Sequence, residues 1–120
     1  MRHGVRIAAG TDFVGPPFTP LGPDACEMEL LVEAGMAPER ALLAGTAEGA
    51  ALLGLGEEAG TLAPGRAADI VAVPGDPRRD IALVRQPGFV MAAGTVVLDR
   101  RAAAAGRCAA QTREDALFKA

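Results

Sequence analysis

A short run near the start of the chain, Val5 to Ala9, constrains the fold more than any other feature. It has the length and largely apolar character of a strand buried on both faces, as in a parallel sheet, so we expect a strand over residues 4–9. Asp12 follows it after a glycine and a threonine. Functional groups of parallel α/β folds collect just past the carboxyl ends of strands, which makes Asp12 a candidate functional residue. The alternative is that Asp12 only caps a helix or forms a turn.

The composition allows one small domain with few large side chains to fill a core. The chain has 120 residues and is 50% hydrophobic, but it contains no tryptophan or tyrosine and only four phenylalanines. The apolar area available for burial is therefore modest for an independent fold.

Charge and patterning argue against several classes of partner. The net charge is −3, and the scattered arginines have no aromatic side chains between them, so we expect no nucleic-acid surface. We expect no membrane span, because no apolar run approaches the ~20 residues that a span requires. We also expect no signal peptide, because only a few apolar residues lie between His3 and Asp12. Cys26 and Cys108 lack metal-type spacing and are expected to be reduced thiols of a cytoplasmic protein.

After the first strand, the sequence predicts a stiff loop and three helices. Residues 13–23 contain four prolines and two glycines, which no regular element tolerates. Helices are expected over roughly 25–34, 38–45 and 47–53, with Glu48 in the first turn of the third. The residues expected to cap or end these helices are Asp24, Gly35, Thr46 and Gly54. The side chains expected to face inward are Met28, Leu31, Val32, Leu42 and Leu43.

The second half of the chain predicts a small antiparallel sheet. Residues 60–62 and 69–73 flank a Pro-Gly turn and predict one hairpin. Residues 89–92 and 95–98 flank Ala93-Gly94 and predict another. We assign no chemistry to the alanine-rich residues 101–120. The first strand has no parallel partner in this sequence, so a neighbour for it must come from elsewhere.

The order and spacing of these segments resemble the C-terminal part of the amidohydrolase superfamily, from Gly4 to about Leu98. The nearest branch is the imidazolonepropionase-like and Xaa-Pro-dipeptidase-like one. Residues 10–12, Gly-Thr-Asp, resemble the end of the eighth barrel strand, and residues 27–42 resemble the helices that follow it. The segments that resemble the exit from the barrel and the return into a small β-sandwich domain are 46–55, 60–62, 64–71 and 75–77.

The fold implied by this resemblance is α/β, an incomplete (β/α)8 TIM barrel with part of its accompanying β-sandwich. Residues 1–55 would form the eighth strand and the helices after it, residues 56–100 a segment of the sandwich, and residues 101–120 a tail.

The resemblance implies a metal-dependent hydrolase of C–N bonds in a small amide, cyclic amide or dipeptide. Asp12 matches the aspartate that contacts the metal, most commonly Zn²⁺, and that shuttles a proton from water to the leaving nitrogen. The histidine, lysine and glutamate ligands that the superfamily places after earlier strands are absent. The single histidine, His3, precedes the strand and is expected to be solvated. These 120 residues alone are therefore not expected to bind zinc tightly or turn over substrate.

Other charged residues are expected to be structural. We expect a solvated helix face for Glu27, Glu29 and Glu33, and turns for Asp76 and Asp80. Arg66 follows Pro64-Gly65 and is expected to be a hairpin residue and not an anion site. Two alternatives to a C-terminal part of a hydrolase stay open: half of a split enzyme completed by another barrel chain, or a non-catalytic interaction or oligomerisation module. In the second case Asp12 would be a relic, and the homo-oligomer interface would be built from Val5, Ile7, Met28 and Leu31.

Overall fold

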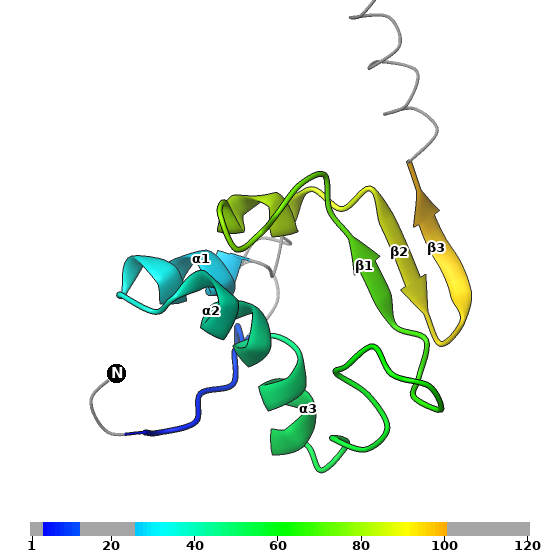
Figure 1. Cartoon of the computed structure of the whole chain (residues 1–120), viewed down its shortest axis with the longest axis horizontal. Coiled ribbons are helices and arrows are strands. Elements are labelled where there is room, and N and C mark those ends of the chain that lie inside the picture. The colour runs from blue at the N-terminus through cyan, green and yellow to red at the C-terminus, as the bar shows by residue number, and fades with distance from the viewer. Residues whose placement is uncertain (1–3, 13–25, 101–120) are drawn as a thin grey trace, which may run out of the picture.

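The computed structural model describes residues 4–12 and 26–100, with a helical cluster beside a small antiparallel sheet (Figure 1). The elements are α1 (Cys26–Glu33), α2 (Pro38–Ala44), α3 (Ala47–Leu52), β1 (Ile70–Ala72), the 3-10 helix η1 (Ile81–Arg85), β2 (Phe89–Ala92) and β3 (Thr95–Asp99). In this part of the chain no helix is long and apolar enough to cross a membrane. Several expectations concern residues outside the described ranges, namely His3, the loop 13–23, Asp24, Cys108 and the tail 101–120.

The three expected helices are confirmed to within two residues at each end, and their glycine stops act as expected. Gly35 and Gly54 have φ of 95° and 76°, a left-handed conformation that glycine adopts without steric cost. Directly after them, the N–H of Met36 donates to the carbonyl of Leu31 at 2.9 Å, and the N–H of Leu55 donates to that of Ala50 at 2.8 Å. These six-residue closures are Schellman motifs, which satisfy the last free carbonyls of α1 and α3.

The expected side-chain cap at Thr46 is wrong. Thr46 does occupy the N-cap position of α3, but its side chain makes no capping hydrogen bond there. Its Oγ1 instead donates to the carbonyl of Leu42 at 2.7 Å. Only Gly45 separates Thr46 from the end of α2, so a free carbonyl of the preceding helix lies within reach of the hydroxyl.

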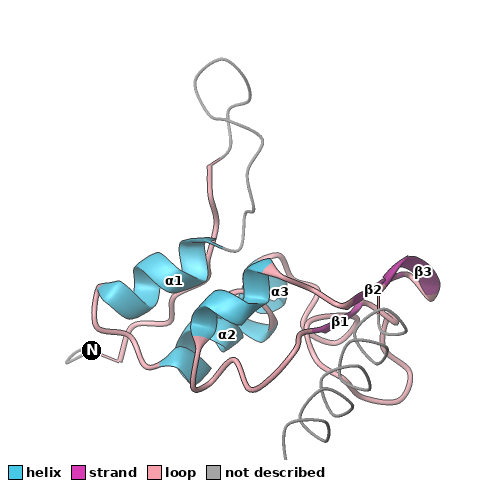
Figure 2. Cartoon of the chain, turned by 90° about the horizontal axis from the view of Figure 1, so that it is seen from above, coloured by secondary structure: helices cyan, strands magenta, loops and turns pink. Residues whose placement is uncertain are grey.

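The buried core of the helical cluster contains one methionine and two alanines. Met36, Ala41 and Ala44 are buried, and Met28, Leu31 and Val32 of α1 pack against them as expected. The inward placement of Leu43 is wrong, since it is 40% exposed. The two alanines face inward instead, which allows α2 to lie close beside α1 (Figure 2).

The expected first strand does not form within the described part of the chain. Residues 4–12 carry no strand pairing, and one backbone hydrogen bond, from the N–H of Ala9 to the carbonyl of Ala44 at 2.9 Å, joins them to α2. A strand requires a neighbour for its N–H and C=O groups, and no neighbouring strand is present among the described residues.

The sheet has the order β1-β2-β3, with both pairs antiparallel. The second expected hairpin is confirmed: β2 turns into β3 at Ala93 and Gly94, whose φ values of 46° and 78° are those of a type I′ turn. The first expected hairpin is wrong, because β1 pairs with β2 and residues 60–62 form no strand. Residues 60–62 lie against α3 instead, where the backbone of Gly60 approaches Ala50.

Candidate active-site segment

Asp12 lies at the end of the described segment 4–12, with its side chain exposed. Its φ is 46°, a left-handed conformation that aspartate adopts more readily than most non-glycine residues. The residue therefore does not continue an extended strand. Within the described ranges, no hydrogen bond or ion pair involves its carboxylate.

Contacts on two sides hold the segment that leads to Asp12. Ile7 and Ala9 pack against the buried core of the helical cluster. On the other side, the Nε of Arg6 lies 2.6 Å from the Oε2 of Glu48 in α3. Sequence reasoning placed Glu48 in a first helical turn but could not pair it with Arg6, because no local periodicity links residues 42 positions apart.

The described residues do not form a metal centre by themselves. Among residues 4–12 and 26–100, no three histidine, cysteine, aspartate or glutamate side chains lie close enough together to hold a metal ion. A catalytic zinc ion takes three protein ligands and a water. Asp12 can contribute one of those ligands, so the part of the chain described here does not fit a complete zinc site.

Glu29 is not the solvated residue that the sequence predicts. Its side chain is 20% exposed, and its Oε1 lies 2.6 Å from the Nε of Arg85 in η1. The contact is an ion pair without a hydrogen bond to this oxygen. This pair ties α1 to η1 and thus the helical cluster to the sheet region. Glu33 is exposed and Glu27 is half-buried.

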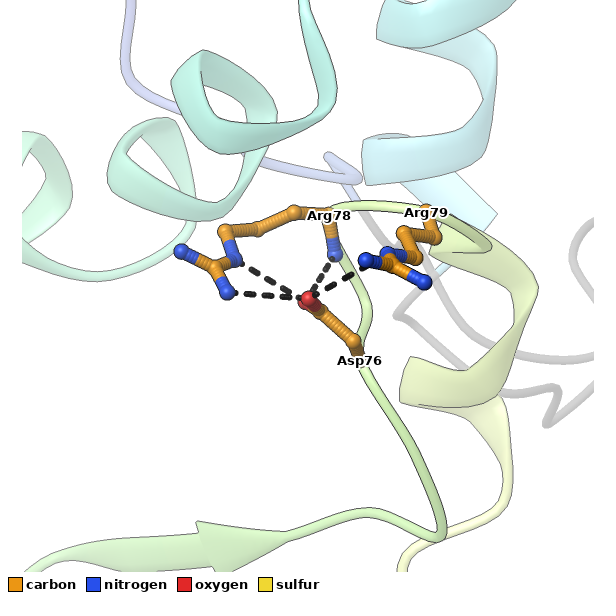
Figure 3. A network of polar contacts seen from close by, with 3 residues as sticks. All are labelled: Asp76, Arg78 and Arg79. Carbon is orange, nitrogen blue, oxygen red and sulfur yellow. Dashed lines mark hydrogen bonds and ion pairs between the residues drawn. The ribbon is translucent and has the colours of Figure 1, made fainter.

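Asp76 forms a turn, as expected, and gathers the neighbouring arginines around it (Figure 3). Its carboxylate accepts hydrogen bonds from the Arg78 backbone N–H at 3.0 Å and from Arg78 side-chain nitrogens at 2.9 Å, and Arg79 lies 4.0 Å away. The side-chain hydrogen bond from Arg78, and after it the backbone hydrogen bond from Arg78, lowers the pKa of Asp76 below its usual value. The side-chain hydrogen bond to Asp76 in turn raises the pKa of Arg78. Asp80 caps η1 by accepting from the N–H of Ala82 at 3.1 Å.

Arg66 does not belong to a hairpin. Its guanidinium donates to the carbonyl of Gly56 and lies 3.4 Å from Glu57. Arg66 therefore closes the loop between α3 and β1. That it is not an anion-binding residue stays a prediction.

A groove of about 620 Å³ lies between α3, the loop after it and the sheet. Its lining is mostly apolar and includes Leu53, Leu62, Val71 and Met91, whereas Asp12 is not part of it. The groove is therefore separate from the candidate functional residue.

The chain is similar to a family model, to curated proteins and to solved structures. The family model described as "Amidohydrolase family" matches residues 1–97. The chain is 38% identical over 94 residues to ochratoxinase of Aspergillus niger, covering 75% of this chain and 18% of that protein. A putative prolidase from Bifidobacterium longum superposes with a TM-score of 0.72 at 36% identity, covering 90% of this chain and 27% of the other.

A further solved structure, an Xaa-Pro dipeptidase with bound methionine in its active site, matches with a TM-score of 0.61 at 30% identity over 63% of this chain and 19% of the other. The chain thus spans about a fifth of the length of its curated relatives. These neighbours imply a TIM-barrel-type superfamily, and the few helices and small sheet are consistent with a part of such a fold. The chain belongs to the amidohydrolase family, which confirms the resemblance in its sequence, and it has Xaa-Pro dipeptidase-like relatives.

Proposed function

We propose that the chain is the C-terminal part of a metal-dependent amidohydrolase that cleaves a C–N bond in a small amide, cyclic amide or dipeptide. The observation that carries the proposal is the family match over residues 1–97, which includes Asp12, the helices and the sheet. Relatives several times longer than this chain support assigning it to one end of a larger enzyme. We assign residues 1–55 to the end of the barrel, residues 56–100 to the small β-sandwich and residues 101–120 to a tail.

In this proposal Asp12 is the active-site carboxylate of the segment. It lies at the end of a chain segment that the core and Glu48 hold in place, and its carboxylate is exposed. An anionic carboxylate in that position can accept a proton from a water and return it to a leaving nitrogen. Amidohydrolases generally use divalent metals, and we assign zinc as the metal here. Because the described residues contain no complete ligand set, the other ligands would come from elsewhere in the protein.

The test is an Asp12→Asn substitution in the full-length, metal-loaded protein. Asparagine has the same size but cannot take up the proton, so we expect kcat to fall by about 10²- to 10⁴-fold with no change in melting temperature. The assay would follow release of proline from Xaa-Pro dipeptides and of amino acids from N-acyl amino acids. Glu33→Gln is the matched control, because it also neutralises an exposed carboxylate. Turnover in Asp12→Asn equal to the control would refute the assignment.

The two other expectations for the chain predict different native assemblies. A split enzyme would give a stable complex of this chain with a second one, which an intact-mass measurement would detect. A homo-oligomer interface built from four apolar residues has less support, because Ile7, Met28 and Leu31 pack against the chain's own core. Of the four, Val5 alone is largely exposed, at 65%.

A further inference from the structure

One carboxylate joins three parts of the helical cluster. Glu48 is in the first turn of α3, and its side chain is only 17% exposed. Its Oε2 accepts a hydrogen bond from the Nε of Arg6 at 2.6 Å, and its Oε1 lies 3.8 Å from the Nη2 of Arg40 in α2. Glu48 therefore links the segment 4–12 to both α2 and α3.

Alternate residues of the segment 4–12 meet different surroundings. Ile7 and Ala9 pack against the apolar core, and the N–H of Ala9 donates to α2. Arg6 and Ala8 instead line a cavity of about 430 Å³ together with Glu48. Apolar packing thus holds one side of the segment. On the side that faces the cavity, the ion pair between Arg6 and Glu48 holds it.

This arrangement fixes how the segment is placed along the helices. A slip of one residue would move the chain by about 3.3 Å and would exchange the side chains on its two sides. The slip would bring a charged arginine against the alanine core and would separate Arg6 from Glu48. The second contact, between Arg40 and Glu48, restricts the rotation of the Glu48 side chain, so the carboxylate that binds Arg6 is itself held in place.

We propose that Glu48 is a positioning residue for Asp12, an inference that rests on the proposed function of Asp12. Through Arg6 it fixes the register of residues 4–12 against α2 and α3, and thereby the point at which Asp12 enters the active site. The contribution to overall stability is small, because Arg6 and Arg40 are 70% and 52% exposed and solvent screens such pairs. The contribution to catalysis is larger, because rates depend steeply on the placement of reacting groups.

The first test is hydrogen exchange of the full-length protein, followed by mass spectrometry of peptides that cover residues 4–12. Glu48→Gln keeps the size of the side chain and removes its charge, so we expect exchange at the Ala9 amide to become at least about threefold faster. Glu57→Gln is the matched control, since it removes a carboxylate from an arginine pair that does not involve this segment. Equal exchange in the two variants would overturn the inference, whatever substrate the enzyme uses.

The second test separates positioning from folding. With an Xaa-Pro dipeptide as substrate, we expect Glu48→Gln to lower kcat about fivefold to tenfold with little change in KM or melting temperature. The double variant Arg6→Met/Glu48→Gln should be no slower than either single variant, because both remove the same contact. Unchanged kcat in Glu48→Gln, in an enzyme that Asp12→Asn inactivates, would overturn the inference. Unchanged kcat in Asp12→Asn would instead refute the proposed function and leave the exchange result to decide the role of Glu48.

Discussion

Replacing Gly60 by alanine should destabilise the protein far more than the same change at Gly65. Both residues have φ of 83°, so a side chain is strained equally at either position. A Cβ on Gly60 would lie 2.7 Å from the Cβ of Ala50, 3.0 Å from the carbonyl oxygen of Thr46 and 3.1 Å from the Cα of Ala47. A Cβ on Gly65 would meet nothing within 4 Å.

The two changes share one cost and differ in another. The left-handed conformation costs a non-glycine residue about 1–2 kcal/mol in both variants. Gly60→Ala adds an overpacking cost of about 1–3 kcal/mol, because the atoms that it would meet belong to backbone or to a Cβ and cannot rotate away. We therefore expect a loss of about 2–5 kcal/mol of unfolding free energy for Gly60→Ala and about 1–2 kcal/mol for Gly65→Ala.

The assay is urea unfolding of the full-length variants, followed by far-UV circular dichroism. Any change in the entropy of the unfolded chain is the same for two glycine-to-alanine substitutions, so it cancels in the comparison. Equal losses of stability would refute the argument, since they would mean that the loop after α3 does not pack on that helix as described.

Two further predictions concern the turns of the sheet region. Ala93→Gly should stabilise the protein by about 1 kcal/mol in thermal unfolding, because Ala93 has φ of 46° in a type I′ turn that favours glycine, and an unchanged or lower melting temperature would contradict this. Asp76→Asn should lower the melting temperature at pH 7. The pKa of Asp76 is depressed in the folded state, so its stabilisation is present above the unfolded pKa of about 4 and is lost as pH falls through the lower folded pKa. The difference between the wild type and Asp76→Asn should therefore shrink steadily as the pH falls below about 4, and a difference that stays constant over that range would show that ionisation is not its source.

Local signals in the sequence predicted much of the helical and hairpin structure. Proline and glycine at helix ends and an Ala-Gly pair between two apolar runs each act on the few residues around them, and these elements form as predicted. The predictions fail where a partner outside the local segment determines the hydrogen bonds. Thr46 bonds back to α2, and β1 pairs with β2 across an intervening 3-10 helix, choices that depend on tertiary distance and not on local pattern.

The candidate site shows the same division. The Gly-Thr-Asp motif pointed to Asp12 through a family resemblance, and the family match over residues 1–97 confirms that resemblance but leaves the role of Asp12 as a proposal. The contact of Glu48 with Arg6 and that of Glu29 with Arg85 could not be predicted, because these partners are 42 and 56 positions apart in the sequence. Charged pairs at such separations carry no periodic signal, unlike an apolar stripe on one helix.

The distribution of apolar side chains explains why activity is assigned to a larger protein and not to this chain alone. Among the described residues, Met36, Ala41, Ala44 and Phe89 are the buried hydrophobic residues, and no large side chain is completely buried. Leu52, Leu53 and Leu62 are between 73% and 79% exposed, and two of them line the groove between α3 and the sheet. Burial of such leucines would contribute about 1.5–3 kcal/mol each, so covering them would stabilise α3 and the loop after it. Under the proposed function, a carboxylate can act at a fixed point only if its supporting helices are fixed, so the apolar cover and the further metal ligands would have to be supplied together.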